Sequence, residues 1–236
     1  MSASDAQLSI VAATGLAREA RIAADPRVRT VAGGGDAAYL ADALEREVRR
    51  GACGIISFGI AGGLRSGVPS GTWLVGERIA TITTRWHCDG AWTKMLCERL
   101  AGALVVDLAG SDAPVAESEA KRALHEATRA AAVDMESHVA ARIAAAHNLP
   151  FAAFRVVADP VDRTLPAAAM IALAPGGRIS GGAVARSLLR QPAQIPLLVR
   201  SAMEASAALR ALSRGRRLLG PGLGYPNLGE FVLDVR

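Results

Sequence analysis

The sequence predicts an α/β protein. Short apolar runs of strand length alternate with Ala-rich stretches in which apolar residues recur at helical spacing. The 236 residues are 51% hydrophobic and 21% charged, which suits one large domain with a substantial core. The clearest unit spans residues 131–166, where a helix of about 11 residues separates two apolar runs. Each apolar run leads into acidic residues, at the edge where open α/β sheets bind ligands.

The chain begins with a strand, a turn and a helix. Residues 8–13 are the apolar strand, residues 14–16 the turn, and residues 17–24 the helix. Arg18, Glu19 and Arg21 lie in the first turns of this helix. Because the turn follows the carboxyl end of a strand, these charges either point into a pocket or form a solvated helix face. Residues 28–32 are a further short strand.

Two glycine-rich stretches follow. Residues 33–35 with Asp36 read as a turn and an N-cap before a helix over residues 37–50. They match neither a dinucleotide fingerprint nor a P-loop, so we interpret them as a simple turn. Residues 54–60 are a second buried strand, followed by a glycine motif over residues 59–64. Glycines after a central strand let a ligand approach the backbone, and we expect one there.

The middle of the chain predicts further alternation. Residues 72–75 and 78–83 are expected as strands of a meander, and residues 86–92 as a polar-aromatic loop. The two tryptophans of that loop either wall a ligand or anchor the core. Residues 104–108 are a strand that ends near residues 110–112, residues 117–129 an amphipathic helix, and residues 151–157 a buried strand. A loop over residues 162–166 follows.

The C-terminal region differs in charge. The net charge of the chain is +5, but from Arg178 onward nine arginines face three acids, which leaves −1 on residues 1–177. We therefore divide the chain into a catalytic core, residues 1–177, and a basic helical extension of the same domain, residues 178–236. Helices are expected over residues 183–190 and 195–212, with an irregular tail from residue 220. Their arginine faces either contact an anionic membrane surface or are solvated while the helices pack on the sheet.

Composition argues against several classes of protein. The three cysteines lack ligand spacing, so we expect no metal site and a reducing compartment. Aromatic residues make up 4%, too few for the stacking surface of a single-stranded nucleic acid binder. No segment resembles a secretory signal or a membrane span. A cytoplasmic protein is expected, at most peripheral at the inner membrane face, with no cofactor and no nucleic acid partner.

If the ligand is a nucleoside, the acids flanking the central helix suit the chemistry of its cleavage. Breaking the bond between ribose and base needs an acid that protonates the leaving base and a carboxylate that grips the ribose hydroxyls. Asp159 suits the acid if burial raises its pKa. Glu136 suits the ribose contact, and Met135 can pack against the sugar. Arg155, four residues before Asp159, can orient a neighbouring carboxylate.

These motifs resemble a known enzyme family. Residues 133–137 (VDMES) and 154–159 (FRVVAD) are similar to the paired motifs of purine nucleoside phosphorylases and methylthioadenosine/adenosylhomocysteine nucleosidases, and residues 59–64 (GIAGGL) to their glycine motif. The resemblance spans about residues 8–170. It implies a three-layer α/β/α fold around a central mixed, partly barrel-like sheet, and an oligomer. It also implies that Glu136 binds the ribose, that Asp159 protonates the purine, and that Ala61, Gly62, Phe154 and Arg155 belong to the substrate site.

Within this family the chain most resembles the hopanoid-associated phosphorylase branch. Residues 13–20 (ATGLAREA), the pairs at residues 159–160 and 165–166, and the Arg-rich C-terminus carry this likeness. The likeness implies release of adenine from adenosylhopane, a membrane-resident nucleoside. Cleavage of methylthioadenosine or adenosylhomocysteine is the alternative, and a non-catalytic nucleoside- or lipid-binding protein is a second alternative.

The chain also departs from the family pattern. Ala158 stands where many relatives have Ser, which removes one expected hydrogen bond to Asp159. The phosphate-binding positions of hexameric phosphorylases align with Ser57 and Ile60 and do not match. Glu19 is the candidate for the water-activating Glu of nucleosidases, offset by one residue. Arg18 or Arg21 would bind phosphate instead if either faced the pocket, so the sequence leaves hydrolysis and phosphorolysis open.

Overall fold

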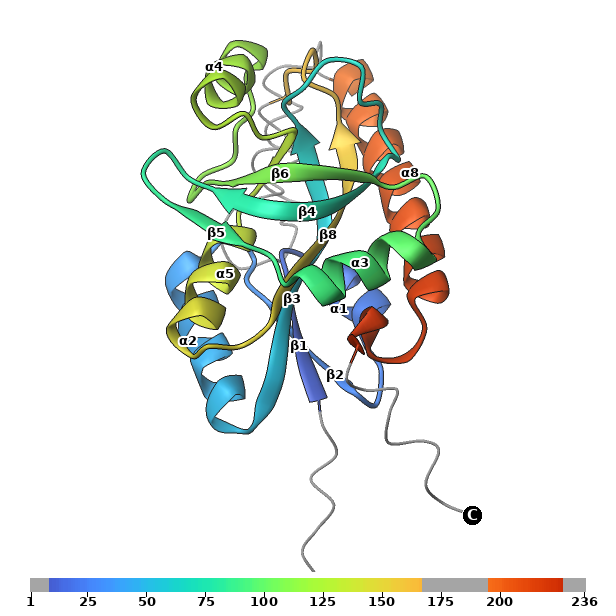
Figure 1. The fold of residues 1–236 in the computed structure, drawn as a ribbon. Helices are drawn as coiled ribbons and strands as arrows, with labels where there is room; N and C mark the ends of the chain where they lie inside the picture. The colour runs from blue at the N-terminus through green and yellow to red at the C-terminus, as the bar shows by residue number, and fades with distance from the viewer. Residues whose placement is uncertain (1–8, 167–194, 227–236) are drawn as a thin grey trace, which may run out of the picture.

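A computed structural model describes residues 9–166 and 195–226 (Figure 1). Eight strands form one mixed sheet. The strands are β1 (Ser9–Thr14), β2 (Val28–Ala32), β3 (Ala52–Gly63), β4 (Trp73–Ala80), β5 (Arg85–His87), β6 (Leu104–Gly110), β7 (Ala132–Asp134) and β8 (Phe151–Asp159). The helices are α1 (Ala17–Ala23), α2 (Ala37–Arg49), α3 (Gly90–Arg99), α4 (Ser118–Thr128), α5 (Ser137–Ala146) and α8 (Ile195–Leu219), with a short 3-10 turn, η2 (Pro221–Gly224).

Five of the strands close into a ring. β3 pairs with β7, β7 with β6, β6 with β4, β4 with β8, and β8 again with β3. β3 and β8 are parallel to each other and antiparallel to β7 and β4. β1 and β2 extend the sheet from the outer side of β3, and β5 extends it from β4. The sheet is therefore part barrel and part open, as the resemblance implied.

Helices cover both faces of the sheet, which gives the predicted three-layer α/β/α arrangement. Alternation along β1 sends Val11 into one core cluster and Ile10 into the other. The first cluster lies under α2 and α5, and the second under α1, α3 and α8, which Figure 1 shows on opposite sides of the strands. The largest fully buried side chain is Trp92, whose ring meets Tyr225 edge-on with 4.8 Å between the centroids.

Several predicted boundaries were wrong. The strand expected over residues 54–60 does not end at Ile60, because β3 continues to Gly63 and pairs there with β7 and β8. The two expected meander strands are one strand, β4. The expected loop at residues 86–92 is the end of β5 and the start of α3, which Asp89 caps by accepting a hydrogen bond from the backbone N–H of Trp92 at 2.8 Å. The Trp92 indole donates to the carbonyl of Leu223 at 3.0 Å, so this tryptophan anchors the core.

The C-terminal helix is longer than expected and belongs to the domain. α8 continues to Leu219, and its Leu209 and Leu212 join the core cluster that contains Phe154 of β8. Among the described residues no helix is both long and apolar enough to span a bilayer. The helix expected over residues 183–190, the boundary between residues 177 and 178, and the end of the tail lie outside the described residues.

Candidate active site

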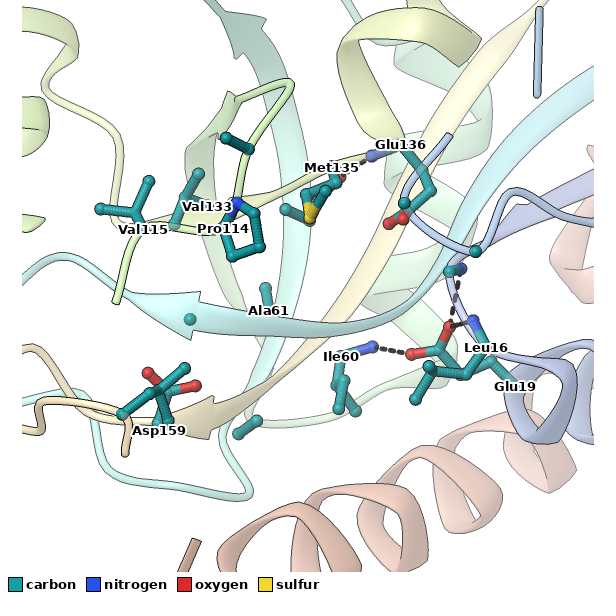
Figure 2. A pocket seen from close by; sticks show the side chains of 18 residues that line it. Leu16, Glu19, Ile60, Ala61, Pro114, Val115, Val133, Met135, Glu136 and Asp159 are labelled. Carbon is teal, nitrogen blue, oxygen red and sulfur yellow. Dashed lines mark hydrogen bonds between the residues drawn. The ribbon is translucent and has the colours of Figure 1, made fainter. Parts of the chain in front are cut away.

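One cavity lies over the C-terminal half of β3. Its volume is about 140 Å³. Acids from separate elements line it, and Figure 2 shows Asp159 across the cavity from Glu19 and Glu136. The remaining lining is apolar or backbone: Gly15, Leu16, Gly34, Gly35, Ile60, Ala61, Gly62, Ala113, Pro114, Val115, Val133, Met135, Ala158 and Leu165, with Asp134 beside Glu136.

The acids converge for a different reason from the one expected. β7 and β8 run in opposite directions, so the acids do not lie at the carboxyl edge of two parallel strands. Instead β3 stands between them. Its Gly62 is opposite Val133 of β7 on one side and opposite Asp159 of β8 on the other. Because Asp134 and Glu136 follow Val133 directly, both acidic segments reach the same half of β3.

Asp134 fixes the turn that presents Glu136. Its Oδ1 accepts hydrogen bonds from the backbone N–H groups of Glu136 at 2.9 Å and Ser137 at 2.6 Å, and its Oδ2 accepts from the Ser137 hydroxyl at 2.6 Å. These N–H groups belong to the start of α5, where carboxylates stabilise the helix end. The turn therefore holds Glu136 at the N-terminus of α5, with its side chain in the cavity (Figure 2).

Arg155 lies beneath the cavity and joins the acids. Its side chain is fully buried, and its Nη2 lies 3.3 Å from Oε2 of Glu136 and 3.0 Å from Oδ1 of Asp134. Nη2 also donates to the hydroxyl of Ser57, which in turn shares a 2.8 Å hydrogen bond with Ser137. This polar network fixes the Glu136 carboxylate from below and leaves its upper side facing the cavity.

Glu19 is held by backbone donors. Its Oε2 accepts hydrogen bonds from the N–H groups of Gly15 and Leu16, and its Oε1 accepts from the N–H of Ile60, all at 2.8 Å. Figure 2 shows these contacts from the β1–α1 turn and from β3. Gly59 makes room for them, because a Cβ there would lie 2.7 Å from the Glu19 carboxyl group and from Nη1 of Arg155. The Glu19 carboxylate thus fills an anion site made of peptide N–H groups.

Asp159 forms a buried ion pair with a residue that the sequence analysis did not single out. Nζ of Lys121, on α4, lies 2.5 Å from Oδ2 of Asp159. Lys121 sits on the buried side of its amphipathic helix, at i−3 from Leu124 and i−7 from Thr128. A lysine in the apolar stripe of a helix was the sequence signal that could have identified it.

Burial raises the pKa of the acids in the cavity. For Glu136 it raises the pKa to about 8, against the lowering effect of Arg155 and with repulsion from Asp134 and Glu19. Burial also raises the pKa of Glu19, opposed by Arg155 and by the N–H groups that it accepts from. The pKa of Asp159 is raised by burial and lowered in part by Lys121. Acids with raised pKa values in a cavity are typical of sites of proton transfer.

Several predicted site residues do not reach the cavity. Arg18 and Arg21 are exposed on the outer side of α1, because the helix turns Glu19 inward and its neighbours outward. Phe154 is fully buried in the core against Phe58, with ring centroids 5.7 Å apart. Arg155 contacts the acids from below and does not line the cavity.

The other predicted site residues do line it. Glu19, Ala61, Gly62, Met135, Glu136 and Asp159 all border the same cavity. The sequence analysis missed the apolar wall formed by Pro114, Val115 and Leu165, which comes from loops without a regular pattern. Among the described residues no group of three or more His, Cys, Asp or Glu has the arrangement of a metal site.

Comparisons with known structures agree with this fold. An adenosylhomocysteine nucleosidase from Streptococcus pyogenes, in complex with 5-methylthiotubericidin, superimposes with a TM-score of 0.59 at 16% identity, covering 80% of this chain and 98% of that one. A methylthioadenosine/adenosylhomocysteine nucleosidase from S. pneumoniae, with a transition-state inhibitor, gives 0.58 at 15% identity, covering 87% and 99%. A futalosine hydrolase from Helicobacter pylori gives 0.60 at 12% identity, covering 89% and 97%. At these identities the likeness shows the fold.

Sequence comparison identifies the family. A search of curated proteins gave no match. The family model described as the phosphorylase superfamily matches residues 28–175, more than half of the chain. The match confirms the prediction of an enzyme from the nucleoside phosphorylase and nucleosidase group. The chain therefore belongs to the phosphorylase superfamily.

Proposed function

We propose that this protein hydrolyses the N-ribosyl bond of an adenosylated nucleoside and releases adenine. The observation that carries the proposal is the convergence of Glu19, Glu136 and Asp159, from three elements far apart in the chain, on one cavity. Their placement fits the three needs of this reaction. Glu136 would hold the ribose hydroxyls, Asp159 would protonate the leaving purine, and Glu19 would activate the nucleophile from near the opposite wall.

The bond changes balance without a cofactor. A water molecule adds its oxygen to the anomeric carbon as the bond from that carbon to the base nitrogen breaks. Glu19 accepts a proton from this water, and Asp159 donates a proton to a ring nitrogen of the leaving base. The positive charge that develops on the sugar lies near the Glu136 carboxylate, which Arg155 holds in position.

Water fits the site better than phosphate does. The backbone N–H groups of Gly15, Leu16 and Ile60, which could bind an anion, already donate to the Glu19 carboxylate. Arg18 and Arg21 are exposed, and Arg155 is buried against Asp134 and Glu136. Among the residues that the structure describes, a phosphate dianion in the cavity would therefore meet carboxylates rather than free cations. This charge distribution supports the proposal of hydrolysis.

The proposed substrate is adenosylhopane, in hopanoid biosynthesis. The sequence likeness to the hopanoid-associated branch motivates this choice. The apolar wall of Pro114, Val115 and Leu165 supports this choice, because these side chains give the lipid part of the substrate a hydrophobic surface beside the acids. A lipid-linked nucleoside also requires the enzyme to reach a membrane.

The first turns of α8 offer a surface for that membrane contact. Ile195, Val199 and Met203 are exposed there on one side of the helix, at i, i+4 and i+8, with relative accessibilities from 46% to 67%. Farther along the same helix Arg210, Arg214 and Arg217 are exposed on one side. The carboxylate of Glu204 pairs with Arg163, which links these turns to the loop that carries Leu165 of the cavity wall. Apolar and basic residues on one helix are typical of contact with an anionic bilayer surface.

Vesicle sedimentation tests this contact. The intact protein is expected to sediment with vesicles of mixed anionic and neutral phospholipid, and the double variant Val199→Ser, Met203→Ser to remain in the supernatant. The variant Lys94→Ala, which changes an exposed charge on α3, serves as the control. Equal sedimentation of the wild type and the double variant would refute the assignment of this surface.

One assay tests the reaction itself. The protein is incubated with adenosylhopane, with and without inorganic phosphate, and adenine and the sugar product are identified by mass spectrometry. We expect adenine and free ribosylhopane in both cases. A sugar phosphate formed only with phosphate would show phosphorolysis and contradict the role proposed for Glu19.

Two other functions have observations in their favour. The superimposed nucleosidases act on methylthioadenosine and adenosylhomocysteine, so cleavage of these soluble thioethers in the same assay would indicate a small-nucleoside nucleosidase. The mismatched phosphate-binding positions favour a non-catalytic binding protein, which would bind adenine tightly and cleave none of the adenosyl compounds. A homo-oligomer also remains our proposal, and light scattering coupled to gel filtration measures it directly.

A further inference from the structure

The environment of Lys121 is built for a charged ammonium group. The side chain is fully buried, with none of its surface exposed. Three oxygens surround Nζ: Oδ2 of Asp159 at 2.5 Å, the carbonyl of Arg163 at 2.7 Å and the carbonyl of Pro160 at 3.2 Å. A protonated lysine has three N–H donors, so each donor has one acceptor.

The choice of lysine is itself informative. The chain contains 27 basic residues, and only two of them, Lys94 and Lys121, are lysines. Lys94 is exposed, with 79% of its side chain accessible. A guanidinium presents its donors as a wide planar fork, whereas an ammonium directs all of them from one atom. Three oxygens that converge on a single nitrogen require the ammonium.

The pair also ties the acid to the loop behind it. The backbone carbonyls that bind Lys121 belong to residues 160 and 163, which follow Asp159 directly. Lys121 thus connects α4 to the end of β8 at the edge of the cavity. None of the described residues on neighbouring segments donates to Oδ1 of Asp159, whereas Oδ2 is occupied by Lys121.

We propose that Lys121 is a positioning residue for the proposed reaction, which holds one oxygen of Asp159 so that the other is presented to the leaving base. The inference rests on the proposed function, in which Asp159 is the acid. Ala158 has no side-chain donor for Asp159, and the ammonium of Lys121 supplies that contact from a different element. The proton donated to the base leaves from Asp159, and Lys121 keeps its own proton throughout.

The charges around Asp159 predict how Lys121 affects the pH profile. From α4 Lys121 lowers the pKa of Asp159, and from α8 the carboxylate of Glu204 raises it, while burial has the largest, raising effect. Arg163 pairs with Glu204, and the exposed pair of Arg122 and Asp162 lies on the surface of the same region. Glu19 and Glu136 face Asp159 across the cavity. Loss of Lys121 would therefore raise the pKa of Asp159.

The variants Lys121→Met and Lys121→Arg test the proposal, with Lys94→Met as the matched control. Activity that needs protonated Asp159 falls as pH rises through its pKa, which forms the alkaline limb of kcat/KM. In Lys121→Met we expect a lower kcat, and an alkaline limb shifted upward by about one to three pH units. Lys121→Arg keeps the charge but not the geometry, so its kcat should fall while its alkaline limb stays near that of the wild type. Lys94→Met should match the wild type in both.

The outcomes separate this inference from the proposed function. An active wild type whose alkaline limb is unchanged in Lys121→Met would overturn the inference alone. If Lys121→Met fails to fold, as circular dichroism would show, a wild-type kcat in Lys121→Arg would overturn it. If the wild type releases no adenine, the proposed function fails, and the pH dependence of adenine binding is measured by calorimetry instead. If the affinity for adenine falls at the same alkaline pH in the wild type and in Lys121→Met, the inference would then be overturned.

Discussion

Burial disfavours the ionised form of the Glu136 carboxyl group. Only 8% of its side chain is exposed, and Arg155 contacts it from below, yet its pKa rises to about 8. The free energy lost by removing water from the Glu136 carboxylate exceeds the free energy gained from its attraction to Arg155. Arg155 is shared, because it also contacts Asp134 and lies near Glu19. A ribose that donates its hydroxyl protons to Glu136 would favour the ionised form, so substrate binding and ionisation support each other.

We predict that Glu136→Gln loses activity without losing its fold. The amide cannot carry the negative charge that would stabilise the sugar cation, so kcat/KM should fall by at least about 10²-fold. Near-normal adenine release from the variant, with an unchanged circular dichroism spectrum, would contradict the role of Glu136.

Glu19 and its neighbours on α1 provide a second test at the scale of residues. Glu19→Gln keeps the size of the side chain but removes the base, so hydrolysis should slow by about 10²- to 10⁴-fold. Binding of adenine should change little, since the proposed function places the base nearer Asp159. Arg18→Ala is the matched control on the same helix turn, and it should retain full activity because Arg18 is exposed. A strong loss in Arg18→Ala, with rescue by high phosphate, would instead support phosphorolysis.

At the scale of elements, β3 makes room for two side chains of the site because Gly59 has no side chain of its own. Glu19 of α1 and Arg155 of β8 meet over Gly59, where a Cβ would lie 2.7 Å from both. β3 can therefore carry the site only with glycine at this position. The need does not come from backbone conformation, because Gly59 is not among the residues with positive φ.

We predict that Gly59→Ala disables the site more than the fold. The added methyl group would displace the Glu19 carboxylate and the Arg155 guanidinium, and a displacement of about 1 Å can reduce activity 10²-fold. Gly90→Ala is the control, because a Cβ at that helix position would have no atom within 4 Å apart from the neighbouring backbone of its own helix. Kinetics and thermal unfolding are measured for both variants. Full activity in Gly59→Ala would show that the close approach has no catalytic consequence.

The docking of α8 on β8 depends on a second close approach. A Cβ at Gly215 would lie 2.5 Å from Cζ of Phe154, so the helix backbone packs directly on this ring. Gly215→Ala should destabilise the protein by about 1–3 kcal/mol through overpacking. Arg214→Ala, at the adjacent exposed position, should change stability by less than about 0.5 kcal/mol. Chemical denaturation compares them, and equal stability would mean that α8 does not depend on this contact.

At the scale of the whole molecule, the cavity acids set how stability varies with pH. Glu136 has a folded pKa of about 8 against an ordinary value of 4.5, and the folded pKa values of Glu19 and Asp159 are also raised. The folded state therefore binds more protons than the unfolded state between these values. Stability from these groups is greatest at low pH and is lost as pH rises toward about 8, the reverse of the usual carboxylate.

We predict that the free energy of unfolding is lower at about pH 8.5 than at about pH 6, and that Glu136→Gln reduces this difference. Replacing an acid that is costly to ionise with a neutral amide removes one source of proton linkage. Urea denaturation at both pH values measures it, with Glu119→Gln, an exposed acid on α4, as the control. A variant that keeps the full pH dependence of the wild type would show that other groups are responsible.

The sequence predicted the elements better than their ends or their partners. Helix α2 and strands β1 and β8 match their expected ranges closely, and α5 has about the expected length. These elements are predictable because the spacing of buried residues within each one is a local property of the sequence. Asp89 as the N-cap of α3 was missed among polar and aromatic residues that also suit a loop. β3 was predicted too short, because glycines end many strands and only pairing with β7 and β8 shows that they continue this one.

By itself, the sequence determined the α/β class, the order of the elements and the acids that follow β7 and β8, since spacing along the chain carries this information. Only the tertiary structure decided that five strands close into a ring, that α1 turns Glu19 inward and Arg18 outward, and that Lys121 pairs with Asp159. The physical reason is that these features depend on register and direction between distant segments. Such contacts are fixed by packing of the whole core, not by the residues on either side of them.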